Sequence, residues 1–384
     1  MLSAAGDQLA QIAVAAVAYE QTRSAFLTAL VYAMSCLPQV IGGPLLAEVA
    51  GLFPRRTVMI GLNLSRAAIA AMMALSRMPF AALCALLVIA VMLGASFSAT
   101  RAATLPEVLP AGQLMAGTEI SSIGSRAGQA LGFLAGGAAV AVLRPGGLLM
   151  MAAVAFLAVA GIISWLASRH PAEQPRPHGR PLALPVTRAE AAAVMRQPLP
   201  RVLLLLGWLA GCAVVPEALA MPYAHVLHGG LAAAGLLMAA IPAGAVAGAA
   251  AITFLPRPSS RLRILAWLAA ASCAPLAALS LHPALWAVLV LWVLAGAAGA
   301  YQLVAASALV RALPAGDRAC AVDLAQSGLL AAQGTGLLTA GIAAQLIGPQ
   351  AAIAVTGLAG LVAAAVLAGT WRRVHGRPGR PAPW

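Results

Sequence analysis

Five ionisable residues lie inside strongly apolar stretches of the chain. Two are carboxylates, Asp7 and Glu217, and three are arginines, Arg66, Arg101 and Arg126. A charge within hydrocarbon is costly and persists where it is paired or borders water, so such residues mark substrate pathways and proton relays. A carboxylate there can bind and release a proton, and a guanidinium can neutralise it or attract an anion. These residue types therefore indicate proton transfer and charge recognition inside a membrane.

The two carboxylates differ in how they can be interpreted. Glu217 is flanked by prolines, which remove backbone hydrogen bonds from a helix, so it needs water or a partner. It is the preferred candidate for a protonatable or substrate-contacting group. Asp7 is either a cavity carboxylate facing Arg101 or Arg126, or a residue at an interfacial helix start.

The composition indicates that these residues are carried by membrane-spanning helices. Of 384 residues, 62% are hydrophobic and 9% are charged, and the mean hydropathy is +0.93. This apolar share is well above that of soluble domains. The net charge of +13 could suggest nucleic-acid binding, but the arginines form short clusters between apolar runs without interleaved aromatic residues. A role in membrane topology explains them better.

Runs of about 20 apolar residues, enough to cross the hydrocarbon core, recur along the chain. They predict an all-α membrane protein with twelve transmembrane helices, divided into a first half (1–168), a cytoplasmic linker (169–199), a second half (200–373) and a cytoplasmic tail (374–384). The expected spans are 2–21, 25–50, 56–76, 80–105, 113–142, 147–168, 200–227, 230–255, 261–281, 284–311, 318–346 and 350–371.

The distribution of arginines predicts the orientation of these helices. If the linker is cytoplasmic, the inner loops and the tail hold most of the arginines, and the outer turns hold only Arg23, Arg77 and Arg144. Both termini are then cytoplasmic. The Ala-, Gly- and Arg-rich composition is typical of a GC-rich bacterial genome, so the expected location is the bacterial inner membrane.

The two halves repeat one another at an offset of 204 residues. The segment Leu109–Gly112 matches Leu313–Gly316, and Glu119 coincides with Asp323. This symmetry suggests a shared structural role for the two acids, such as capping or pairing with Arg126 and Arg318. Parallel six-helix repeats are the arrangement in which a substrate site forms at the midplane between the halves.

Several short motifs carry a family resemblance that covers nearly the whole chain. They are Gly6-Asp7-Gln8, Gly43-Pro44-Leu45, Gly51-Leu52-Phe53-Pro54-Arg55-Arg56, Arg66, Arg101 with Leu105-Pro106-Glu107, Gly132-Phe133-Leu134-Ala135-Gly136-Gly137, and Pro216-Glu217. With these motifs the chain resembles the major facilitator superfamily, particularly the bacterial drug- and siderophore-efflux branch with its macrolide and enterobactin exporters. The resemblance implies a secondary transporter that works by alternating access.

The loop after the second span departs from the family pattern. The family has an acidic residue followed by a turn and paired basic residues, which together lock one conformational state. Here Arg55 and Arg56 remain, Gly51 stands at the acidic position, and Glu48 could substitute for it from one helical turn away. The alternative is that Arg55 and Arg56 serve only as topology determinants.

Glycines at intervals of four lie along one face of the fifth span and allow close contact with another helix. They are Gly124, Gly128, Gly132 and Gly136. Exporters of the superfamily often carry a proline-containing glycine motif here, and this chain has Phe133 in place of the proline. Simple tight packing is therefore favoured over an antiporter-specific kink.

No cofactor or metal site is expected. The five cysteines are scattered without metal-ligand spacing, and neither a phosphate-binding loop nor a hydrolase motif is present. The preferred function is proton-coupled efflux of a small, moderately hydrophobic compound by a monomer in contact with lipid. The alternatives are an uptake facilitator of the same fold and a receptor or scaffold that does not transport.

Overall fold

The predicted all-helical fold is confirmed by the computed structural model. The structure describes residues 1–36, 54–75, 78–108, 114–143, 145–169, 188–253, 258–314 and 317–375. Every regular element within these ranges is either an α-helix or a short 3₁₀ turn. Glu48 and Gly51 of the expected inner loop, most of the linker and most of the tail lie outside these ranges. The described part of the linker contains a short helix, α7 (Arg188–Arg196).

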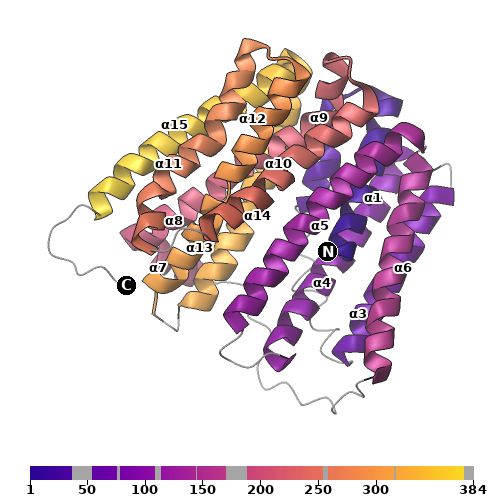
Figure 1. The fold of residues 1–384 in the computed structure, drawn as a ribbon, viewed down its shortest axis with the longest axis horizontal. Helices are drawn as coiled ribbons and strands as arrows, with labels where there is room; N and C mark the ends of the chain where they lie inside the picture. The colour runs from indigo at the N-terminus through magenta and orange to yellow at the C-terminus, as the bar shows by residue number, and fades with distance from the viewer. Residues whose placement is uncertain are drawn as a thin grey trace.

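The first half contains α1 (Leu2–Thr22), a helical segment Ala25–Cys36, α3 (Arg55–Leu75), α4 (Phe80–Val108), α5 (Leu114–Val142) and α6 (Pro145–Arg169). The second half begins with α8 (Pro198–Leu209), the 3₁₀ turn Ala210–Ala213 and α9 (Val214–Val226). It continues with α10 (Gly230–Thr253), α11 (Pro258–Ala277), the 3₁₀ turn Ala278–Leu281, α12 (Leu285–Ala298), α13 (Tyr301–Ala312), α14 (Arg318–Ile347) and α15 (Pro349–His375). Figure 1 shows the two sets of helices side by side.

The helix boundaries repeat with the offset of 204 that the sequence shows. Adding 204 to the bounds of α4 gives 284–312, and α12 with α13 covers Leu285–Ala312. The same shift moves α5 to 318–346, where α14 covers Arg318–Ile347, and moves the start of α6 to Pro349, the first residue of α15. The two halves therefore share one helix pattern in the same chain direction.

Nine helical segments of the described ranges are long and apolar enough to cross a membrane. The helices α1 and α5 are not among them, although they contain 21 and 29 residues. Both carry several polar residues within their length, among them Asp7, Gln8, Ser125 and Gln129. The remaining expected span is described only from Ala25 to Cys36. The predicted total of twelve is consistent with these segments.

Proline explains why the first span of the second half is not one regular helix. The ring of Pro216 cannot donate to the carbonyl of Cys212 and would clash with it in an α-helix. The chain forms a 3₁₀ turn at Ala210–Ala213 and resumes as α9 at Val214. Glu217 lies in the first turn of α9, directly after this change of geometry.

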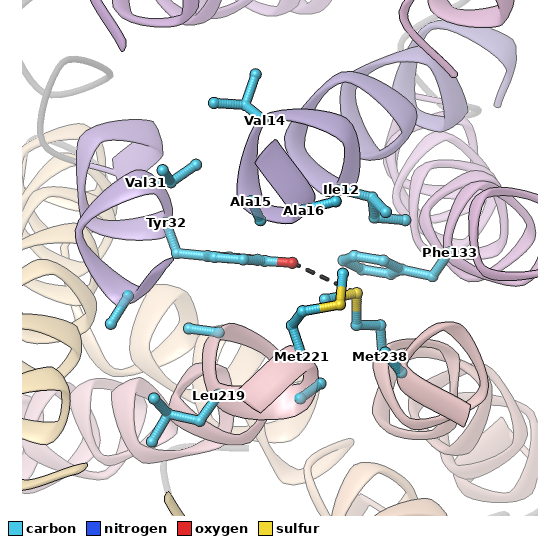
Figure 2. Packing of buried hydrophobic residues seen from close by; sticks show 14 of the residues in the cluster. Ile12, Val14, Ala15, Ala16, Val31, Tyr32, Phe133, Leu219, Met221 and Met238 are labelled. Atoms are coloured by element: carbon cyan, nitrogen blue, oxygen red, sulfur yellow. Dashed lines mark hydrogen bonds between the residues drawn. The ribbon is translucent and has the colours of Figure 1, made fainter. Parts of the chain in front are cut away.

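The two halves share one hydrophobic core at one end of the molecule, which we call the Arg23 end. This core joins buried residues of α1 and Ala25–Cys36 to residues of α9 and α10. Figure 2 shows the ring of Tyr32 between Ala15 and Met221, with its hydroxyl directed at the sulfur of Met238, 3.6 Å away. A second core, near the linker, joins residues of the second half to Val194 of α7, and none of its described members comes from the first half. The halves therefore meet at the Arg23 end.

Candidate functional site: a central cavity between the halves

A cavity of about 400 Å³ lies between the two halves. It is lined mainly by α1, α3, α4 and α5, and the second half contributes Gln326 and Leu330 of α14. Two of its described lining side chains are charged, Asp7 and Arg101. Two larger hollows, of about 550 and 700 Å³, lie within the second half, and none of their described lining residues is charged. The central cavity is therefore the hollow where charge and both halves come together.

Asp7 forms an ion pair with Arg66 of α3. The Arg66 side chain is 1% exposed, whereas that of Asp7 is 45% exposed and reaches the cavity. Arg66 also donates to the hydroxyl of Ser3 at 3.1 Å, and its guanidinium carbon lies 4.0 Å from the centre of the Phe156 ring. A buried guanidinium needs such partners because its desolvation is expensive. Asp7 thus links a buried cation to the cavity.

The close approach of α1 to α5 places Asp7 at this position. A Cβ atom added to Gly128 would overlap the backbone of Met1, and one added to Gly132 would lie 2.8 Å from the backbone of Ala5. Gly136 faces Ile12 one turn further along. The glycine face of α5 therefore packs against α1 and holds the first two turns of α1 beside the cavity.

The other charged candidates are divided between the cavity and its surroundings. Arg101 of α4 lines the cavity, and among the described residues no carboxylate forms an ion pair with it. Glu119 and Arg126 lie on α5, and their side chains are outside the description. Asp323 lies on α14 and is exposed. Arg55 and Arg56 form the first turn of α3 and are half-buried.

Glu217 lies at the contact between the halves and does not line the central cavity. It is half-buried on α9, close enough to Tyr32 and Cys36 of the first half to act on both electrostatically. The sequence did not indicate this neighbourhood. Glu217 therefore lies near the interface between the halves, while Asp7 is the described carboxylate that borders the cavity.

The segment Ala25–Cys36 and α14 run antiparallel along the shared core. Ser24 donates to Gln345 at 3.2 Å, and Cys36 contacts Gln333 at 3.9 Å. Between them, a Cβ atom on Gly341 would lie 2.8 Å from Ala29. The two contacts are twelve residues apart along each helix, from Ser24 to Cys36 and from Gln333 to Gln345, which corresponds to about 18 Å of helix. The cavity begins where this seam ends, at Ser35 and Leu330.

A second seam joins α5 to α10 on the other side of the core. Here Gly137 and Gly235 approach so closely that a Cβ atom on either would overlap the backbone of the other. The repeat offset relates the seams, because Gly137 plus 204 is Gly341. The two seams close the Arg23 end of the cavity on both sides.

A small polar cluster covers the outermost part of this closure. The Nη1 atom of Arg23 lies 3.2 Å from the Nε2 atom of His225 on α9, and the rings of Tyr19 and His225 meet edge to face at 5.8 Å. Since a guanidinium can only donate, the Nε2 atom of His225 must accept, which requires a neutral imidazole. Arg23 and His225 therefore form a latch between α1 and α9.

Replacement of Arg23 by alanine should weaken this latch. The change removes one exposed hydrogen bond between α1 and α9, worth about 0.5–1.5 kcal/mol, so the open population at the Arg23 end should rise roughly two- to tenfold. Spin labels at the exposed positions Leu75 and Leu281 would report longer separations. Arg311→Ala, at an exposed site on α13, is the matched control, and equal distance distributions in both variants would contradict the latch.

Several site features could not be read from the sequence. The neutral lining residues Gln11, Gln129 and Gln326 belong to none of the motifs that the sequence shows. Phe156, whose ring lies against the guanidinium of Arg66, and Gly94, where an added Cβ atom would lie 3.3 Å from that guanidinium, come from different helices. The only available signal was the lower hydropathy of α1 and α5, because helices that face a polar cavity need fewer apolar residues.

Comparisons with known proteins agree with this architecture. A family model described as Major Facilitator Superfamily matches residues 1–266. A search of curated protein sequences finds no significant match.

Three solved structures illustrate the likeness in fold. An inward-facing, unoccupied bacterial homologue of the human lysosomal transporter Spinster is 17% identical, with a TM-score of 0.68 over 99% of this chain and 97% of that one. A POT family transporter in complex with a thioalcohol-conjugated peptide is 11% identical, with a TM-score of 0.76 over 97% and 95%. The nucleoside transporter NupG is 12% identical, with a TM-score of 0.69 over 97% of each chain.

The family model covers more than half of the chain. The three solved structures are transporters, and each matches this chain over nearly its full length. The helices are those of a multi-pass membrane protein. The match therefore indicates a membrane transporter and not an enzyme, and the chain belongs to the major facilitator superfamily.

Proposed function

We propose that the protein is a secondary active transporter that exports a small, moderately hydrophobic compound through the central cavity in exchange for protons. The observation that carries this proposal is the Asp7–Arg66 pair, in which a carboxylate borders the cavity and its partner is buried. Protonation of Asp7 would leave Arg66 without its counter-charge and so alter the packing of α1 against α3. A proton could in this way bias the position of the first half.

Alternating access is the motion that this architecture supports. The seams and the shared core lie on the Arg23 side of the cavity, and the described part of the core near the linker contains no residue of the first half. We assign the linker side to the cytoplasm, because the outer turns carry few arginines. In that orientation the described conformation is closed toward the outside. A reporter fused after Trp384 that is found outside the cytoplasm would overturn the assignment.

The experiment is gradient-driven flux in proteoliposomes, guided by a susceptibility panel in an efflux-deficient host. We expect flux to require a proton gradient and to be lost in the double variant Asp7→Asn with Arg66→Gln, while exchange of substrate without a gradient survives. Glu217→Gln is the comparison: loss of coupling there, with the Asp7 and Arg66 variant unaffected, would move the proton site to α9. Flux only from the outer to the cytoplasmic face of the protein would indicate the uptake alternative. No flux and no protection for any compound class would indicate the receptor or scaffold alternative.

A further inference from the structure

The charges around the central cavity do not balance. Asp7 is the carboxylate of its described lining and is neutralised by Arg66 from behind. Arg101 remains, half-exposed to the same cavity, with no carboxylate in ion-pair contact among the described residues. Among the described lining residues, Arg101 is therefore a cation without a described counter-charge.

The rest of the lining supplies an apolar wall and neutral hydrogen-bonding groups. Ile69, Met73, Leu87, Val91 and Phe97 form much of the wall on α3 and α4. Amide and hydroxyl donors come from four glutamines and several serines, among them Gln129 and Ser125 of α5 and Ser98 of α4. Amides and hydroxyls can donate to an anion as well as accept from a neutral group. Such a site suits a molecule with an apolar body and one charged end.

We propose that the transported compound is an amphiphilic organic anion, with a single carboxylate or a similar charge on an apolar body, and that Arg101 pairs with this charge. This inference rests on the proposed function, because it assumes that the central cavity is the substrate site. A cavity of about 400 Å³ falls within the range of small-molecule pockets. A guanidinium offers paired N–H donors that match a carboxylate, and no carboxylate of the described residues forms an ion pair with Arg101.

A cationic compound would bind poorly in the same cavity. It would approach an unpaired guanidinium, and Asp7 could bind it only by giving up Arg66, which is 1% exposed and would then be a buried charge without a partner. An anion requires neither change. It is also driven outward by a membrane potential that is negative inside, which agrees with export.

The test uses three fluorescent probes of nearly equal shape: dansylglycine as the anion, dansylglycinamide as the neutral form and dansylethylenediamine as the cation. Equilibrium binding is measured on the purified full chain in nanodiscs. We expect the anion to bind at least tenfold more tightly than the other two. Arg101→Gln should reduce anion affinity to that of the amide, Arg101→Lys should restore part of the preference, and Arg311→Gln, on α13 outside the cavity, should change nothing.

Equal binding of the three probes, tighter binding of the cation, no binding of any probe, or an anion preference that survives Arg101→Gln would each overturn the inference. Thermal unfolding of each variant shows whether a loss of affinity comes from misfolding, and the lysine variant keeps the inference testable if the glutamine variant does not fold. Binding of the anion at Arg101 without flux would contradict the proposed function and leave standing only the part of this inference that assigns an anion site to Arg101. Proton-driven flux of neutral or cationic compounds, without flux of anions, would support the proposed function and contradict this inference.

Discussion

Asp7→Asn is expected to lower the free energy of unfolding by about 3 kcal/mol, because it leaves the Arg66 guanidinium buried without a counter-charge. Removing one partner of a buried ion pair typically costs about 3–5 kcal/mol. The lower value applies here, since Asp7 is 45% exposed and cavity water reaches the pair. The measurement is thermal or denaturant unfolding of the purified protein in detergent.

The double variant Asp7→Asn with Arg66→Gln is the decisive companion. It removes both charges and should recover most of the lost stability, because the cost arises from the unpaired cation and not from the missing carboxylate. Glu20→Gln, at an exposed position near the end of α1, is the matched control and should be neutral. If Asp7→Asn unfolds like the parent protein, the ion pair does not contribute to stability.

Gly137→Leu should lower the transport rate at least tenfold. At the seam between α5 and α10 even a single Cβ atom on Gly137 would overlap the backbone of Gly235, so a leucine side chain prevents the halves from closing at the Arg23 end. Overpacking at such a contact costs about 1–3 kcal/mol or more, enough to move a conformational equilibrium tenfold or further. Flux in proteoliposomes and the separation of spin labels at Leu75 and Leu281 measure the two effects.

Gly161→Leu is the matched control for this substitution. Gly161 lies on α6, where an added Cβ atom meets nothing within 4 Å, so leucine there should leave flux and label separation unchanged. Gly137→Ala is expected to give an intermediate effect. Normal flux in Gly137→Leu would show that the closed seam is not required in the transport cycle.

Most of the fold was predictable because length and hydropathy determine which segments can cross a bilayer. The repeat offset was visible as well, and the bounds of α4, α5 and α6 recur 204 residues later within one or two residues. Helix ends depended on local chemistry that was harder to anticipate. Thus α15 continues beyond the expected residue 371 to His375, and α8 begins at Pro198, two residues before the expected start.

The site was predictable only in its residue types. Charges in apolar stretches identified Asp7, Arg66 and Arg101, but the partner of Asp7 depends on how α1 and α3 pack, which a single sequence does not specify. The same limit applies to Glu217, whose neighbours Tyr32 and Cys36 lie about 180 residues away in the chain. Contacts between the halves are long-range, and no local pattern encodes them.

Most of the described side-chain contacts between the halves at the Arg23 end join neutral groups. Ser24 with Gln345, Tyr32 with Met238 and Cys36 with Gln333 are uncharged pairs, and His225 must be neutral to accept from Arg23. Dissolved salt screens interactions between exposed charges and has little effect on neutral hydrogen bonds and apolar packing. The balance between the two access states should therefore be nearly independent of ionic strength, so the transporter can keep the same cycle in dilute and in saline surroundings.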